Sequence, residues 1–454
     1  MMISKQTKHI LGILILCTCS LNHTLAQFKP PRILEHPTQI RTEILTVLNS
    51  TYRETNISIS PDGKYLFFMS GRGQMPWSNP FYHTYKGRPE HDGDIWFSVR
   101  AAGKWQYPQC LSATVNTSQG EDEPNISPDG QIVHFQSWRN SWRRDGGPYY
   151  QSSRYANQWN NPRGLGGGIT QFFMDLQDHG EPWGSVATDG ATLSADGNTF
   201  IVAAGKDYSG NMDLYISRKS ATGFWAYPRR LSVSTLGNER SPFLTADGKT
   251  LYFASDGYGG WGGLDILKTT IREDNSHDEI VNLGRPFNTW LDDYGFTLTA
   301  TGDDAYFVRE GDIYYADTKE SSPELKPNNA TLIIAGIITN SKTQKGTSAN
   351  IVIKSVKDKK IIAQAQSNAL TGEYAIVLPI TATDIIQEVS KTGFTPASKN
   401  HQVIIKTGLN TIQSDVALSP VGTPDVLVNN DPPKEVVKEA AADFGKEENV
   451  LENR

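Results

Sequence analysis

The stretch SISPDGKYLFFMSGR, from Ser58 to Arg72, decides the fold of this chain of 454 residues. It contains two apolar runs separated by Asp62-Gly63, and Asp-Gly favours a tight β-hairpin because glycine adopts positive φ at no steric cost. Nearly the same text returns at 125–137, 192–205 and 243–255, and in a degraded form at 297–309. The chain is therefore built from a repeated hairpin.

The spacing of the copies is typical of propeller blades. The turn glycines lie 67, 67 and 51 residues apart, at Gly63, Gly130, Gly197 and Gly248. A third strand follows each hairpin, as in DGDIWFSVR from Asp92, and a Trp-containing turn leads to a short fourth strand, as in GKWQYPQCLS from Gly103. Such a sheet has apolar side chains on both faces, so it needs a neighbour on each side. We therefore predict an all-β chain with a five-bladed β-propeller.

The sequence of the segments between blades predicts how the ring closes. LSATVNTSQGEDEPN from Leu111 precedes the second hairpin, and the similar ILTVLNSTYRETN from Ile44 precedes the first. Residues 40–48 are therefore expected to supply the outer strand of the last blade, which removes the open edges. The divergent stretch 164–190 leaves a sixth blade open as an alternative.

The repeat resembles the WD40-like PD40 family, which also forms the propeller of TolB-type proteins. The resemblance covers residues 40–318 and rests on the SPDG or SADG turn followed by a strand of the DIY type. It implies the propeller fold. It implies no activity, because unrelated functions share one fold.

A second module follows the propeller. Residues 319–330 are polar and read as a linker, and residues 331–419 then alternate as strands with few aromatic residues. GIITNSKTQKGTSANIVI, TGEYAIVLP and VSKTGFTP resemble the carboxypeptidase-regulatory-like domain, which implies a small prealbumin-like β-sandwich. The charged residues 420–454 are predicted to be mostly disordered.

The first 26 residues indicate export. Lys5 and Lys8 precede the short apolar run from Ile10 to Cys17, and Thr24-Leu25-Ala26 suits signal peptidase. A lipoprotein is the less favoured alternative, because neither Cys17 nor Cys19 follows a small lipobox residue. No later run is long and apolar enough to span a membrane. We expect an exported protein of the periplasm or outer membrane, without a transmembrane segment in the mature chain.

The order of the two modules resembles that of PorE-like, OmpA-family envelope proteins of Bacteroidetes, some of which belong to the type IX secretion system. The resemblance implies an envelope or secretion-system protein as partner. Only residues 420–454 follow the second module, so we expect no OmpA-like domain. The net charge of −6, without a basic stripe, speaks against a nucleic-acid partner.

Acidic residues recur just before each first strand, where a propeller blade approaches its central channel. One reading is an acidic funnel that binds a cation, a basic segment or a sugar; the favoured alternative is that each carboxylate caps its own loop. The candidates for the channel are Glu54, Glu123, Glu181, Glu239 and Asp293.

Aromatic residues gather in the loops that follow the hairpins. They are predicted either to form a binding surface for a protein or glycan or to pack as loop cores, and they are Trp77, Tyr82, Trp138, Trp142, Tyr149, Tyr258 and Trp261. Asp256 and Asp265, in SDGYGGWGGLD, are weak calcium candidates, although a Gly-rich hairpin needs no metal.

The sequence contains no catalytic or cofactor motif, and no His/Cys spacing of a zinc site. We therefore expect a non-enzymatic envelope protein that uses a propeller face for protein–protein interaction, without a cofactor. The alternative from another class is a propeller that binds or degrades polysaccharide, since paired carboxylates serve glycoside hydrolysis.

Overall fold

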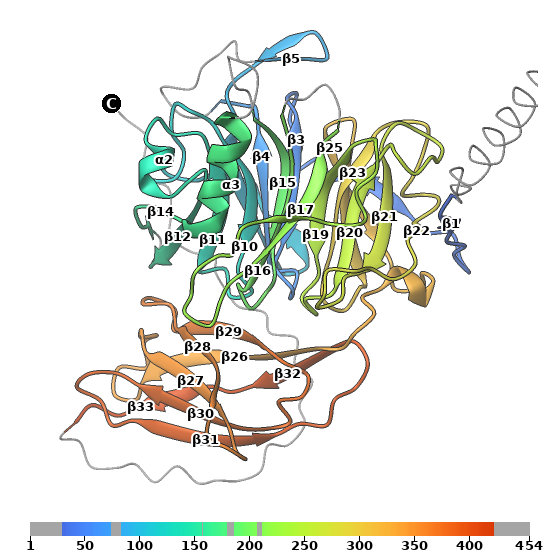
Figure 1. The fold of residues 1–454 in the computed structure, drawn as a ribbon. Coiled ribbons are helices and arrows are strands. Elements are labelled where there is room, and N and C mark those ends of the chain that lie inside the picture. Colours follow the sequence, from blue (N-terminus) through green and yellow to red (C-terminus); the bar gives the residue numbers. More distant parts are fainter. Residues whose placement is uncertain (1–29, 74–82, 157, 179–185, 207–210, 422–454) are drawn as a thin grey trace, which may run out of the picture.

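The computed structural model describes residues 30–421, apart from 74–82, 157, 179–185 and 207–210. Five mainly antiparallel sheets stand around a common axis, and two further sheets lie below them (Figure 1). This architecture confirms the predicted all-β fold class with a five-bladed propeller. We call the propeller face that is turned toward the two further sheets the lower face, and the opposite one the upper face.

The first three blades follow one another along the chain. The first contains β3 (Glu54–Ile59), β4 (Tyr65–Ser70), β7 (Asp94–Ala101), β8 (Lys104–Trp105) and β9 (Gln109–Cys110). The second contains β10 (Glu121–Ile126), β11 (Ile132–Ser137), β12 (Tyr149–Tyr155), β13 (Gln158–Trp159) and β14 (Arg163–Gly164), with the short helix α2 (Trp142–Asp145). The third contains β15 (Ala187–Leu193), β16 (Thr199–Gly205), β17 (Asp213–Arg218) and β18 (Arg229–Arg230).

The last two blades are completed by the N-terminal ribbon. The fourth contains β19 (Glu239–Leu244), β20 (Thr250–Ser255), β21 (Asp265–Thr270), β22 (Val281–Asn282) and β1 (Arg32–Ile33). The fifth contains β23 (Asp293–Leu298), β24 (Asp304–Arg309), β25 (Asp312–Asp317) and β2 (Thr42–Ile44). Strand β2 pairs antiparallel with β25, with Thr42 opposite Ala316, which confirms the predicted closure. The parallel pairing of β1 with β22 was not predicted.

The ring has no sixth blade among the described residues. The innermost strands β3, β10, β15, β19 and β23 contact one another in that order, and β23 contacts β3. The stretch 164–190 instead contains α3 (Gly167–Asp178), whose Ile169 and Phe173 are fully buried. Apolar residues at 169, 172, 173 and 176 follow the i, i+3, i+4, i+7 pattern of a helix, so the sixth-blade alternative is wrong.

The tryptophans of the outer turns stabilise the contacts between blades. Trp159 of the second blade meets Phe67 of the first edge to face, with ring centroids 6.1 Å apart. Trp105 of the first blade meets Tyr306 of the fifth in the same way, at 5.7 Å. Neighbouring blades thereby bury the apolar faces that one sheet alone would expose.

The C-terminal part consists of two stacked four-stranded sheets. One contains β26 (Thr331–Asn340), β29 (Glu373–Leu378), β32 (Leu409–Gln413) and β33 (Val416–Leu418). The other contains β27 (Asn350–Ser355), β28 (Ile361–Gln366), β30 (Asp384–Ser390) and β31 (Ala397–Gln402). Alternate residues of both sheets point inward and form one apolar core, in which Ile334, Ile351 and Ile385 are fully buried.

The connecting segment 319–330 is packed against the propeller. It contains the 3-10 helix η1 (Pro323–Leu325), whose Leu325 is fully buried beside the fourth and fifth blades. The ammonium group of Lys268, on β21, donates hydrogen bonds to Glu324 O at 2.5 Å, Lys326 O at 2.7 Å and Asn328 Oδ1 at 2.7 Å. The segment therefore fixes the stacked sheets to the propeller.

The stacked sheets lie under the lower face of the propeller (Figure 1). Lys64 forms an ion pair with Glu373 at 2.9 Å, and Asn368 Nδ2 donates to Gln131 Oε1 at 2.6 Å. Between these contacts lies a cavity of about 570 Å³, which is lined by the lower ends of the blades and by β28 and β29. The lower end of the axis is thus covered, and among the described residues no sheet covers the upper face.

Candidate functional site

Every innermost strand carries a β-bulge halfway along its length, where two residues face one on the neighbouring strand. Each bulge contains one residue with positive φ, and these are Asn56, Glu123, Gly190, Ser241 and Gly295. Positive φ is rare for residues other than glycine. Backbone strain of this kind clusters at functional sites. All five residues line a small cavity on the propeller axis.

One carboxylate of the second blade, that of Glu123, lines this cavity, and Asp122 directly precedes it on the strand. Asn56 Nδ2 donates to Asp122 Oδ1 at 2.8 Å, and the Tyr149 hydroxyl donates to Glu123 Oε2 at 2.5 Å. Burial, with a contribution from Asp122, raises the pKa of Glu123 to about 8. Burial also raises the pKa of Asp122 to about 6.

The other charges near the axis are paired. Arg240 Nη1 lies 3.0 Å from Asp189 Oδ2, which joins the fourth blade to the third. Arg53 lies 3.3 Å from Glu90, which is 2 % exposed and belongs to β6 (Arg88–Glu90). That strand pairs with β5 (His83–Tyr85) in a hairpin that rises from the upper face (Figure 1). Asp122 and Glu123 have no such ion pair, so the axis carries an excess of negative charge when both are ionised.

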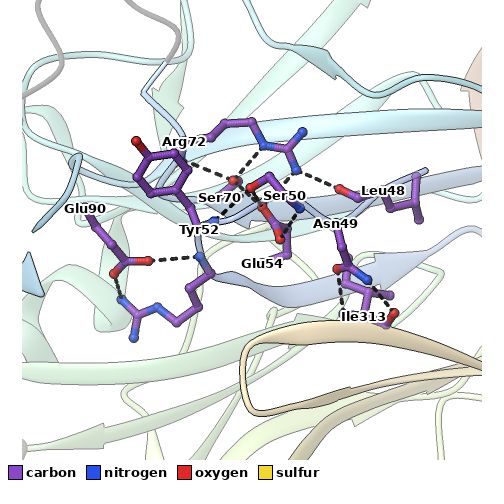
Figure 2. A network of polar contacts seen from close by, with 10 residues as sticks. Leu48, Asn49, Ser50, Tyr52, Glu54, Ser70, Arg72, Glu90 and Ile313 are labelled. Carbon is purple, nitrogen blue, oxygen red and sulfur yellow. Dashed lines mark hydrogen bonds and ion pairs between the residues drawn. The ribbon is translucent and has the colours of Figure 1, made fainter. Parts of the chain in front are cut away.

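Glu54 is held by its own loop and does not line the cavity. Figure 2 shows its carboxylate accepting from Ser50 N at 3.0 Å, Ser50 Oγ at 2.6 Å and Ser70 Oγ at 2.8 Å, with Arg72 Nη2 at 2.8 Å. The carboxylate is fully buried, and each of its partners is a donor. This carboxylate therefore ties the loop between blades to the top of the hairpin.

The same arrangement occurs in three further blades. The backbone N–H and hydroxyl of a threonine donate to a carboxylate four residues later, in the pairs Thr117–Glu121, Thr235–Glu239 and Thr289–Asp293. The structure thus places the predicted channel residues Glu54, Glu239 and Asp293 in loop-capping positions, and it brings only Glu123 to the axis. The physical reason is that each lies at the upper start of its strand, beside loop donors. Glu181 lies outside the described residues.

The capping carboxylates have a sequence signature that our sequence analysis missed. It is Asn or Ser, then Ser or Thr, then Glu or Asp four residues later, as in NSTYRE, NTSQGE, STLGNE and NTWLDD. The leading asparagine binds the third strand of the preceding blade: Ile313 N, on β25 of the fifth blade, donates to Asn49 Oδ1 at 2.7 Å, and Asn49 Nδ2 donates to Ile313 O at 2.9 Å (Figure 2). An alignment of the segments between blades could have found this pattern.

Three of the predicted surface aromatics form a packed cluster. Trp138 contacts Trp142 with ring centroids 5.4 Å apart, and Phe173 of α3 lies 5.9 Å from Trp138 and 5.4 Å from Tyr149. Tyr149 is 1 % exposed and Trp142 is 7 % exposed. These rings pack as a core beneath α3, as the loop-core alternative predicted, and Trp138 remains partly exposed. Trp77 and Tyr82 lie outside the described residues.

The other two predicted aromatics lie in the upper loop of the fourth blade. Tyr258 is partly buried against Phe253, and its hydroxyl donates to Val233 O at 2.6 Å. Trp261 is 40 % exposed, and the guanidinium of Arg285 lies 5.4 Å from the centre of its ring. Trp261 is therefore the aromatic from the sequence list that remains available at the described surface.

An exposed patch surrounds Trp261 on the upper face, and we call Leu236, Trp261, Arg285 and Trp290 the upper patch. Leu236 is 93 % exposed and Trp290 is 79 % exposed. Their loops contact that of Trp261: Asn238 N donates to Asp256 Oδ1 at 2.7 Å, and Leu264 N donates to Asp292 Oδ1 at 3.0 Å. Sequence analysis missed Leu236 and Trp290, although each directly follows the threonine of a capping signature, in STLGNE and NTWLDD.

The two weak calcium candidates each serve a hydrogen bond of the loops. Asp256 accepts from the backbone and the side-chain amide of Asn238, at 2.7 and 2.8 Å. Asp265 accepts from Trp261 N at 2.9 Å, and burial raises the pKa of its carboxyl to about 6. Within the described ranges, no group of three His, Cys, Asp or Glu side chains is arranged to hold a metal.

The same part of the chain contains no helix that is long and apolar enough to cross a membrane.

Fold and site together define a five-bladed β-propeller with a polar axis and an exposed upper patch, mounted on two stacked sheets. No protein-family model matches the chain, and no curated protein does. Similar solved structures include TolB from Acinetobacter baumannii, at 16 % identity over 61 % of this chain, with a TM-score of 0.31. The chain spans 57 % of the length of that protein.

Glycoside hydrolases are also among the similar solved structures. The catalytic domain of the GH62 α-L-arabinofuranosidase from Coprinopsis cinerea is 10 % identical over 63 % of this chain and 98 % of its own, with a TM-score of 0.39. A glycosyl hydrolase from Bacteroides ovatus is 10 % identical over 64 % of this chain and 98 % of its own, also with a TM-score of 0.39. At such identities the likeness concerns the fold alone.

Proposed function

We propose that this chain is a non-enzymatic protein of the bacterial cell envelope whose upper propeller face binds a partner protein, within type IX secretion or envelope assembly. The observation that carries the proposal is the upper patch. It places Trp261, Arg285 and Trp290 together on the face that the stacked sheets leave uncovered. Export rests on the signal-like residues 1–26, which lie outside the described part of the chain.

The chemistry of the upper patch suits a protein partner. Exposed tryptophan and arginine side chains are the residue types that contribute most to the binding free energy of protein interfaces. Arg285 already covers one face of the Trp261 ring, which orients that ring before a partner arrives. A preoriented aromatic side chain loses little conformational entropy on binding.

The lower half of the molecule suits the role of a mount. The Lys268 contacts and the buried Leu325 hold the connecting segment on the propeller, and the ion pair between Lys64 and Glu373 holds the stacked sheets under it. A fixed mount presents the upper face in one direction, as an envelope assembly requires.

The alternative is a glycan ligand on the same patch. The rings of Trp261 and Trp290 would stack on sugar faces, as aromatic platforms do. Hydrolysis would further require two free carboxylates at a defined separation. Of the predicted acidic residues, Glu54, Glu239 and Asp293 accept hydrogen bonds from loop donors, so these three do not supply such a pair.

Site-specific photocrosslinking in producing cells tests the proposal. A photoreactive residue at position 290, on the upper patch, is compared with one at position 224, where the 70 % exposed Phe224 lies in the lower outer hairpin of the third blade. We expect one defined protein adduct from position 290 and none from position 224. The double variant Trp261→Ala, Arg285→Ala, with the crosslinker still at 290, should lose that adduct.

Two outcomes contradict the proposal. Equal adducts from both positions, or an adduct that survives the double variant, exclude the upper patch as the interface. Glycan-array binding that needs Trp261 and Trp290, without any protein adduct, supports the glycan alternative instead.

A further inference from the structure

Three buried oxygens without a hydrogen-bond partner come together on the propeller axis. They are Asn56 Oδ1, Glu123 Oε1 and Ser241 Oγ, from the first, second and fourth blades. Their residues are 7, 2 and 5 % exposed, and all three line the same axial cavity. Buried polar atoms are almost always satisfied in folded proteins, so three such oxygens around one cavity mark it as a candidate binding site.

In Asn56 and Glu123, the other polar atom of the side chain is already hydrogen-bonded. The unsatisfied oxygen is therefore the atom that is available to a ligand. The amide nitrogen of Asn56 is bound to Asp122, so its oxygen is the end without a partner. The Tyr149 hydroxyl is bound to Glu123 Oε2, so Oε1 is the end without a partner. Groups that ligate metal ions are commonly oriented in this way by neighbouring hydrogen bonds.

The backbone also serves this arrangement. Glu123 and Ser241 have φ of 55° and 47°, a conformation that L-residues seldom adopt. Glycines occupy the corresponding positions in the third and fifth blades, where Gly190 approaches the backbone of Ser241 closely. The bulges thereby bring side chains from blades far apart in sequence to one point.

The charge around the cavity favours a cation. Arg53 and Arg240 form ion pairs with Glu90 and Asp189, and among the described residues no ion pair involves Asp122 or Glu123. The cavity, of about 20 Å³, has room for one water molecule or one ion. A water molecule matches the size, whereas a cation also compensates the charge of Glu123 when that carboxyl is ionised.

The geometry points to a binding site for one hard cation on the propeller axis, with calcium as the best match, held by Glu123 Oε1, Asn56 Oδ1 and Ser241 Oγ. All three donors are oxygens, which calcium prefers, and one of them belongs to a carboxylate. Because no third acidic, histidine or cysteine ligand stands nearby in the described chain, backbone carbonyls and water complete the shell. The site is independent of the proposed partner on the upper patch.

Calcium titration of the full chain after treatment with EDTA tests the site. We expect calcium to raise the melting temperature and to bind with one-to-one stoichiometry in calorimetry. Terbium, a calcium analogue, should give luminescence sensitised by Tyr149, and calcium should displace it. The variant Glu123→Gln should lower calcium affinity by more than about tenfold, as loss of a metal-site group does.

Matched variants locate the effect. Asp256→Asn, which alters the other calcium candidate, should keep wild-type calcium affinity. Asn56→Ala removes a second ligand but keeps the carboxylate, and it should also weaken binding, with folding checked by circular dichroism. The inference is overturned if calcium neither shifts the melting temperature nor quenches terbium emission, if Glu123→Gln binds calcium like wild type, or if Asp256→Asn alone loses binding.

Discussion

Glu121 and Glu123 lie two residues apart on the same strand, and their surroundings are opposite. Glu121 accepts hydrogen bonds from Thr117 and from Ser137, and Arg139 lies 3.6 Å away. Glu123 lies in the bulge with one oxygen held by Tyr149 and the other without a partner. The first environment recurs in four blades, whereas the second occurs at one described position.

This difference shows how to separate structure from function in a repeat protein. Four blades contain the same loop-capping carboxylate because each has a loop before its first strand whose buried donors need an acceptor. The axis is shared by all blades, so one carboxylate there can serve a single ligand. An acidic residue that recurs in every repeat is therefore weaker evidence for a site than one that departs from the repeat.

The largest expected effect is the loss of a capping carboxylate. Glu121→Ala leaves the Thr117 and Ser137 donors and the Arg139 charge without their buried partner. We expect a loss of about 3–5 kcal/mol in the free energy of unfolding, measured by urea denaturation. Thr117→Ala, which removes one hydroxyl donor, should cost only about 1 kcal/mol. Equal losses in the two variants would contradict the capping role.

The next effect concerns pH and the axial carboxylate. Burial raises the pKa of Glu123 to about 8, so the folded chain binds this proton more tightly than the unfolded chain does. In calcium-free buffer, this contribution to stability is present below the pKa of the unfolded carboxyl and is lost as the pH rises toward 8. Glu123→Gln should remove most of this loss and be about 1–3 kcal/mol more stable than wild type at pH 8.

Neighbouring carboxyls limit that comparison. Burial raises the pKa values of Asp122 and Asp189 as well, so Glu123→Gln should retain part of the slope of stability against pH. Arg53 and Arg240 keep their charge over this range. A variant whose urea-unfolding profile against pH coincides with wild type would show that Glu123 does not titrate as its burial requires.

A third effect concerns a buried charge whose donors are all used. Lys268→Met removes the ammonium group that binds two backbone carbonyls and Asn328 of the connecting segment. We expect stability to fall by about 1–3 kcal/mol and limited proteolysis to increase within 319–330. The exposed Lys319, in the same segment, provides the control variant Lys319→Met, which should be cleaved like wild type. Unchanged cleavage of Lys268→Met would show that the segment is held by Leu325 alone.

The smallest effect belongs to the upper patch. Trp290 is 79 % exposed, so Trp290→Ala should change the free energy of unfolding by no more than about 0.5 kcal/mol. Trp142→Ala, in the cluster beneath α3, should cost about 3–5 kcal/mol in the same measurement. A large loss for Trp290→Ala would mean that this ring stabilises the fold and is not free for a partner.

Much of the fold could be predicted from the sequence. The Asp-Gly hairpins, the strands that follow them and the closing ribbon at 40–48 were all visible as repeated text, because each repeat satisfies its hydrogen bonds locally. The helix α3 was missed, because it lies in a stretch whose sequence does not follow the repeat. The pairing of β1 with β22 was missed, because two residues carry no pattern.

The site was predicted less well, for reasons that specific residues make clear. Trp138 and Trp142 are surface candidates by sequence position, but α3 covers them, and a helix that covers a loop is a tertiary event. Trp290 lies inside the capping signature NTWLDD, but that signature specifies Thr289 and Asp293 and not whether the ring between them is exposed. Among the acidic candidates, Glu54 fits the capping signature and Glu123 does not, but this difference appears only when the segments between blades are aligned.

By itself, the sequence determined that this chain folds into repeated four-stranded sheets that close through the N-terminal ribbon, since hairpin signals and apolar alternation act over short distances. Only the tertiary structure decided which polar groups are satisfied. The capping carboxylates find their donors within their own blade. The oxygens of Asn56, Glu123 and Ser241 meet because three bulges from distant blades point at one axis.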